Sequence, residues 1–261
     1  APEMDIAESI ATTDNQNFTV KLVKGYKFQD GTEVKSKNFV DAWNYAAYGP
    51  NGMSSGYFME PLEGYGDLQC TGPAADAAGA VTDPCAGAGA AKAKALTGLK
   101  VVDDYTFTIK TTLPVSNLPV RLGYSAFSPM PDKFFADPKS DSFGKMPIGA
   151  GPFKMVSNSA TEIVIEKFAD YSGKNKPKVS KVTFRIYNDA APAYADTVAN
   201  NLDVTDLIPS DQLANDQWKK DLAGRQGLRE SGVTQTMTPA FKDTQLDNVD
   251  LLKAFSMSLD R

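Results

Sequence analysis

The early part of the chain alternates hydrophobic and polar side chains and then changes to a helical spacing. Phe18, Val20 and Leu22 alternate with polar neighbours, which predicts a strand with one buried face. The Asp30-Gly31 pair then predicts a tight turn, because glycine adopts positive φ angles without strain. A helix is expected next, with Ser36 at its N-cap. The predicted buried face of this helix consists of Phe39, Ala42, Trp43 and Ala46.

The same periodicities assign elements to the rest of the chain. Alternation predicts strands at residues 105–110, 153–156, 163–165 and 182–187. Helical spacing predicts helices at residues 118–122, 133–136, 188–202 and 213–222. We expect a loop at 137–145, a strand after the helix at 188–202, and a final helix whose apolar stripe includes Leu252 and Phe255. Strand, helix and strand in this order are typical of an α/β unit, so we predict a mixed α/β fold.

Composition places the chain among ordinary globular proteins. Its 261 residues suffice for one large or two modest domains, and 42% are hydrophobic while 23% are charged. No apolar run approaches the roughly 20 residues that a membrane-spanning helix needs.

The net charge and the absence of histidine exclude several classes of function. The formal net charge is −5, and no basic cluster is interleaved with aromatic residues, so a nucleic-acid partner is not expected. The chain contains 0 histidines, which removes the usual general base and any Ser-His or Cys-His arrangement. Neither an enzyme active site nor a cofactor is predicted.

Other candidate chemistry is weak. Asp203, Asp206 and Asp211 lie close together but lack the alternation and central glycine of a calcium loop, and we expect them to be solvated or to cap helices. Residues 149–151, Gly-Ala-Gly, lack the third glycine and the following helix of a phosphate loop, and are expected to form a turn.

Cys70 and Cys85 flank a segment rich in glycine and alanine. They can form a disulfide, remain free thiols, or supply half of a metal site. A zinc site would need two further ligands, and a redox motif would need Cys-x-x-Cys spacing, so we predict the disulfide. Closing a loop of about 15 residues contributes about 3 kcal/mol in the chain-entropy model. Such a bond implies an oxidising, extracytoplasmic compartment.

Four runs along the chain carry a family resemblance. The first is KGYKFQDGTEVKSKNFVDAW at residues 24–43. The others are LKVVDDYT at 99–106, PIGAGPFK at 147–154, and FKD followed by LKAFSMSLDR within 241–261. In this order, the runs resemble the family 5 solute-binding proteins, the extracytoplasmic peptide receptors of ABC importers.

The resemblance implies a fold of the type II periplasmic-binding-protein class, with a large lobe and a small subdomain. Residues 1–130 would form the small subdomain of the first lobe, and residues 131–237 would form part of its large α/β subdomain. Residues 238–261 would leave through the hinge and begin the second lobe. Family members extend further on both sides, so a partial chain is implied. Asn201 would replace the glycine that ends a helix.

The resemblance also implies a function and candidate ligand-binding residues. Such receptors capture an extended ligand, here expected to be an oligopeptide, between two lobes and deliver it to ABC importer permease subunits. A monomer is expected, located in the periplasm or held at the cell surface as a lipoprotein. The second lobe supplies most charged anchors, so this chain would form one wall of the cleft. The candidate residues, chosen near the crossings between subdomains, are Tyr57, Ser128, Thr234, Gln235 and Thr236.

Two other classes of function are compatible with the residues. A secreted hydrolase that uses carboxylates needs no histidine, since glycosidases work with two acids. A cell-surface adhesion domain would also suit an acidic chain with a disulfide. Aromatic residues near glycine, such as Tyr57, serve in packing as well as in binding.

Overall fold

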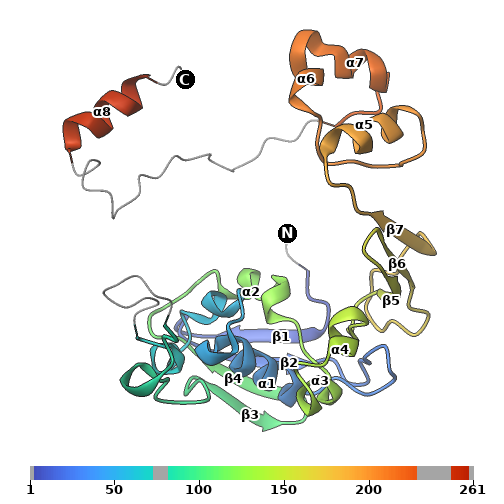
Figure 1. Cartoon of the computed structure of the whole chain (residues 1–261). Coiled ribbons are helices and arrows are strands. Elements are labelled where there is room, and N and C mark those ends of the chain that lie inside the picture. Colours follow the sequence, from blue (N-terminus) through green and yellow to red (C-terminus); the bar gives the residue numbers. More distant parts are fainter. Residues whose placement is uncertain (1–2, 73–81, 228–247, 259–261) are drawn as a thin grey trace. The chain divides into compact units, whose positions relative to one another are not determined.

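A computed structural model describes residues 3–72, 82–227 and 248–258 (Figure 1). The chain divides into two compact units, Ala1–Tyr187 and Asn188–Arg261. The predicted boundary after residue 130, within the first lobe, and the predicted boundary after residue 237 stay predictions, and the second of them lies outside the described residues.

A four-stranded antiparallel sheet forms the centre of the first unit. Its strand order is β1-β2-β4-β3, and β2 and β4 occupy the middle because their alternate side chains are apolar and buried. The strands are β1 (Ala7–Thr12), β2 (Asn17–Leu22), β3 (Leu99–Asp103) and β4 (Thr106–Lys110). The predicted strands at 18–22 and 105–110 are therefore confirmed.

Helix α1 (Ser36–Ala47) covers one face of this sheet (Figure 1). Phe39, Ala42 and Trp43 are buried, as their spacing predicts. The Trp43 ring lies edge-on to Phe107 of β4, with 5.5 Å between ring centroids. The run that carries the family resemblance therefore supplies core residues.

The N-cap of α1 differs from the prediction. Ser36 is the first helical residue and Lys35 is the N-cap. The Lys35 N–H donates to the Asn38 side-chain oxygen at 2.8 Å, and the Ser36 N–H donates to the Asp104 carbonyl at 2.8 Å. Because the contact with Asp104 holds Ser36 against the β3–β4 turn, its side chain is buried instead of capping the helix.

Short helices and turns connect the strands of the first unit. They include η1 (Gly49–Asn51), η2 (Gly56–Met59), η3 (Tyr65–Leu68), η4 (Gly87–Gly89), α2 (Leu118–Arg121), η5 (Ser125–Phe127), α3 (Asp132–Ala136) and α4 (Asp141–Lys145). The predicted helices at 118–122 and 133–136 are confirmed. The expectation of a loop throughout 137–145 is wrong, because α4 forms there and Phe143 packs on Phe134 with 5.2 Å between ring centroids.

A second antiparallel sheet, in the order β5-β6-β7, completes the first unit. Its strands are β5 (Phe153–Asn158), β6 (Glu162–Lys167) and β7 (Lys181–Arg185), which confirms the strands predicted there. The glycine-containing turn at 149–151 leads directly into β5, as the sequence predicts.

The second unit contains helices that depart from their predicted lengths. They are α5 (Ala190–Val198), α6 (Ser210–Leu213), η6 (Ala214–Asp216), α7 (Gln217–Leu222) and α8 (Val249–Ser258). The single helix predicted at 213–222 is wrong, because Asn215 and Asp216 adopt positive φ angles and break it. Trp218 and Leu222 nevertheless bury the apolar face that the pattern indicates, against Tyr194 of α5.

The end of α5 also corrects two predictions. The residue in the left-handed region is Asn200, at φ 64°, and not Asn201. The Arg225 guanidinium donates to the carbonyls of Thr197 and Val198, which satisfies acceptors that the helix end leaves free. Residues 199–209 contain no strand, so the predicted strand after this helix is wrong.

The cysteine-flanked insertion is closed at its base. Cys70 and Cys85 form a disulfide, with 4.7 Å between their Cα atoms. Next to it, the Thr71 N–H donates to the Gly89 carbonyl and the Gly72 N–H donates to the Pro84 carbonyl, each at 2.9 Å. Residues 73–81 of the predicted surface excursion lie outside the described part of the chain.

Trp43→Phe should destabilise the protein by about 2–3 kcal/mol, because it removes buried ring volume and leaves the Phe127 carbonyl without its donor. Urea unfolding of the full-length protein measures the change. Val102→Ala is the control, since Val102 on β3 is exposed. Equal stabilities of the two variants would contradict the role given to Trp43.

The unreduced protein should contain no titratable thiol from Cys70 or Cys85 after denaturation. A double Cys→Ala variant should lose about 3 kcal/mol of stability, because the unfolded chain gains freedom when the loop is open. Thiol titration without reductant and urea unfolding test the two statements. Two reactive thiols would show that the pairing is wrong.

Candidate ligand-binding surface

A group of three aromatic residues, two exposed and one partly buried, lies where η2 meets the segment after α2. Tyr57 and Phe58 stack with 4.3 Å between ring centroids, and Phe58 lies 5.2 Å from Tyr124. Tyr57 is 62% exposed and Tyr124 is 57% exposed. We call these three residues the aromatic surface. Sequence reasoning selected Tyr57 but not Tyr124, although both follow a glycine.

The aromatic surface is anchored to the core. Phe58 contacts Phe127 with 6.4 Å between ring centroids, and Phe127 contacts Trp43 at 5.1 Å. The Trp43 Nε1–H donates to the Phe127 carbonyl at 2.9 Å. Gly56 allows η2 to approach α1, because a Cβ there would lie 2.5 Å from the Ala46 carbonyl oxygen. The exposed rings therefore stand on a fixed support.

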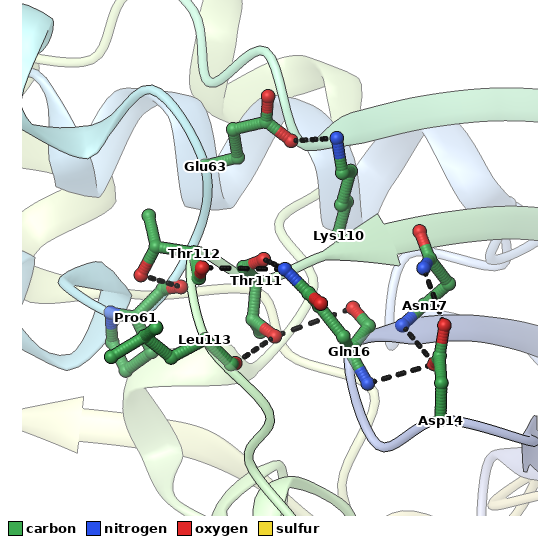
Figure 2. Close-up of polar contacts among 9 residues, drawn as sticks. All are labelled: Asp14, Gln16, Asn17, Pro61, Glu63, Lys110, Thr111, Thr112 and Leu113. Atoms are coloured by element: carbon green, nitrogen blue, oxygen red, sulfur yellow. Dashed lines mark hydrogen bonds and ion pairs between the residues drawn. The ribbon is translucent and has the colours of Figure 1, made fainter.

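The segment between β4 and α2 is held by the turn between β1 and β2 (Figure 2). Figure 2 shows the Gln16 side-chain amide donating to the carbonyls of Thr111 and Thr112, at 3.0 and 3.2 Å. The Thr111 hydroxyl donates to the Leu113 carbonyl at 2.7 Å. These bonds set the path that leads to α2 and, beyond it, to Tyr124.

Asp14 in turn fixes the β1–β2 turn. Its carboxylate accepts the backbone N–H groups of Gln16 and Asn17, at 2.9 and 2.8 Å (Figure 2). These bonds, with that from the Asn17 backbone the strongest, hold the pKa of Asp14 well below its usual range. Gln16 is thereby positioned for its long-range bonds.

One hollow adjoins the aromatic surface at Tyr124, and a second hollow adjoins the first. One, of about 450 Å³, is lined by Asn117, Val120, Arg121, Gly123 and Tyr124. The other, of about 560 Å³, shares Asn117 and Arg121 with the first, and its lining includes Glu60 and Leu113. A ligand that covers the aromatic surface therefore has a hollow next to it.

Ser128 lines a different cavity, of about 480 Å³, between the two sheets. Gln29 closes one side of this cavity: its side-chain amide donates to the Phe153 carbonyl at 2.6 Å and accepts the Gly149 N–H at 3.0 Å. The walls also include Ile148 and Ile165, so the cavity is largely apolar with a few polar groups.

Two tyrosines and a carboxylate lie beside the same cavity. The hydroxyls of Tyr26 and Tyr171 both donate to the Asp5 carboxylate, at 3.1 and 2.9 Å. Burial, more than the nearby carboxylate, raises the pKa of both tyrosines. The arrangement ties the segment before β1 to the loop after β6 and was not foreseen from the sequence.

The two predicted site residues in the described part of the chain, Tyr57 and Ser128, have different surroundings. Tyr57 belongs to the aromatic surface, while Ser128 follows Phe127 and lines the cavity between the sheets. Thr234, Gln235 and Thr236 lie outside the described residues. The roles of all five stay predictions.

The acidic candidates form no site. Asp203, Asp206 and Asp211 are exposed, and Asp211 accepts a hydrogen bond from Gln212 at 2.9 Å. Within 3–72, 82–227 and 248–258, no cluster of three or more histidine, cysteine or acidic side chains could hold a metal ion. No helix in these ranges has the length and apolar character to cross a membrane.

All 261 residues match the model of the bacterial extracellular solute-binding proteins, family 5, middle region. The chain therefore belongs to this family, as its sequence motifs predict. Family members are solute-binding proteins and not enzymes, and they act outside the cytoplasm.

Two curated relatives are oligopeptide-binding proteins. The chain is 25% identical over 254 residues to the periplasmic oligopeptide-binding protein OppA of Haemophilus influenzae, covering 96% of this chain and 43% of that protein. It is also 25% identical over 270 residues to the oligopeptide-binding protein OppA of Bacillus subtilis, covering 100% of this chain and 45% of that protein. The chain thus spans less than half the length of both relatives.

A solved structure confirms the predicted fold class. The crystal structure of Haemophilus influenzae OppA in complex with the peptide RPPGFSPFR matches with a TM-score of 0.67 and 23% sequence identity. The match covers 84% of this chain and 40% of that one. The described units therefore have the mixed α/β architecture of part of a periplasmic binding protein.

The free energy of unfolding should fall as the pH rises above about 10, the ordinary tyrosine pKa. Tyr26 and Tyr171 have raised pKa values in the folded protein, so they hold their protons more tightly there, and the stability they contribute is lost as the pH rises. A Tyr26→Phe, Tyr171→Phe double variant should show a shallower fall in urea unfolding, and Tyr57→Phe is the control. Equal slopes in all three proteins would contradict the prediction.

Proposed function

We propose that the protein is the substrate-binding component of a peptide-class ABC importer. It captures an extended oligopeptide between two lobes and delivers it to the permease. The observation that carries the proposal is the match of all 261 residues to family 5. The names of the two curated relatives favour an oligopeptide over other solutes.

The aromatic surface is the part of the described chain best suited to face a peptide. Aromatic rings supply large contact area with little loss of rotamer freedom, and here two exposed rings stand on a buried support. We therefore place Tyr57 at one wall of the cleft. Ser128, Thr234, Gln235 and Thr236 are proposed for the same wall, from their positions near the crossings between subdomains.

The working partners of the protein follow from this proposal. Peptide binding and release would occur outside the cytoplasm, with the protein either in the periplasm or held as a cell-surface lipoprotein. The closed disulfide suits an oxidising compartment. We propose a monomer that meets the permease subunits of the importer.

The two alternative functions receive less support. A carboxylate-dependent hydrolase needs two acids placed across a substrate, and the clustered aspartates of the second unit, Asp203, Asp206 and Asp211, are exposed to solvent. No contact in the described part of the chain supports a cell-surface adhesion function.

Isothermal titration calorimetry of the full-length protein with defined short peptides tests the proposal. Saturable binding is expected, and a free peptide concentration a hundredfold above Kd should add about 2.7 kcal/mol to the stability. Tyr57→Ala should weaken binding about 2- to 10-fold through the loss of ring contacts, while the β3 variant Val102→Ala should not. Turnover of peptide or glycan that a single Asp or Glu substitution abolishes would overturn the proposal.

A further inference from the structure

The aromatic surface has a cation beside it. Arg121 ends α2, and Arg121 and Tyr124 line the same hollow of about 450 Å³. Among residues 3–72, 82–227 and 248–258, the Arg121 guanidinium has no ion-pair partner in the structure. Glu60 lines the adjoining hollow with Arg121, but the two side chains do not pair. On a chain with net charge −5, an unpaired cation favours a ligand that carries a negatively charged group.

The backbone segments that carry the rings and the cation are held in place before any ligand arrives. Leu118, which starts α2, is fully buried, and the segment leading to it is bonded to Gln16 (Figure 2). On the other side, Phe58 rests on Phe127. A backbone fixed in this way loses little conformational entropy when the surface binds, which strengthens binding for a given set of contacts.

We propose that this surface recognises a peptide whose C-terminal residue is aromatic. The ring of that residue stacks against Phe58 and Tyr124, and its carboxylate pairs with the Arg121 guanidinium. Rings prefer offset or edge contacts with other rings, and Arg matches a carboxylate with two parallel N–H groups. Tyr124 is thus a specificity-determining residue. The inference rests on the proposed peptide-binding function and names the class of peptide.

The experiment compares three peptides on the full-length protein by calorimetry. They are tetra-alanine, Ala-Ala-Ala-Phe with a free carboxylate, and the same peptide as its C-terminal amide. The Phe peptide should bind about 2- to 10-fold tighter than tetra-alanine, from the added ring contacts. The free acid should bind about 2- to 5-fold tighter than the amide, as expected for an exposed ion pair.

Variants assign each preference to its residue. Tyr124→Leu should reduce the preference for Phe, since only the Phe58 ring then remains for stacking, and Tyr124→Phe should keep it. Arg121→Gln should abolish the preference for the free acid, and Lys100→Gln on β3 should keep it. Tyr124 and Arg121 are exposed, so melting temperatures should show that the variants stay folded.

The outcomes separate this inference from the proposed function. If the wild-type protein binds none of a broad set of peptides, the proposed function fails. If it binds tetra-alanine and the Phe peptide equally, or if Tyr124→Leu and Arg121→Gln retain both preferences undiminished, the protein remains a peptide receptor and this inference is wrong.

Discussion

The packing of Trp43 between the sheet and η5 is the contact on which the first unit depends. Its ring lies within 5.5 Å of both Phe107 and Phe127, and its N–H bonds the Phe127 carbonyl. This one side chain therefore fixes α1 against β4 and also fixes the segment that precedes Ser128. Because buried aromatic rings combine large apolar area with directional contacts, such a residue determines the position of several elements at once.

Polar contacts between distant segments complete the scaffold. Gln29 bonds the turn after β2 to the start of β5, and Asp5 receives two tyrosine hydroxyls from different loops. Gln16 bonds the segment before α2. Each of these groups satisfies backbone or hydroxyl partners that local structure leaves free. The first unit thus presents exposed side chains from irregular segments on a rigid base.

The stretch that identifies the family and the surface proposed to serve its function are separate. Residues 24–43 carry the most specific motif, yet Phe39 and Trp43 within it are buried. Tyr57 and Tyr124, by contrast, lie in segments with little regular structure and are exposed. Loops positioned by a rigid scaffold commonly carry binding residues, while core residues preserve the fold.

The sequence by itself determined the elements whose patterns are local. Alternation at 18–22 predicted a strand and helical spacing at 39–46 predicted a helix, and both are present. The disulfide of Cys70 and Cys85 was favoured because a zinc site would need two further ligands. Tertiary contacts decided the rest. The Asp104 carbonyl draws Ser36 into the helix, so Lys35 becomes the cap, and left-handed residues break the helix predicted at 213–222. The contact of Tyr124 with Phe58, the neighbour of Tyr57, likewise could not be predicted from the sequence, because packing between distant segments, and not periodicity, brings these two rings together.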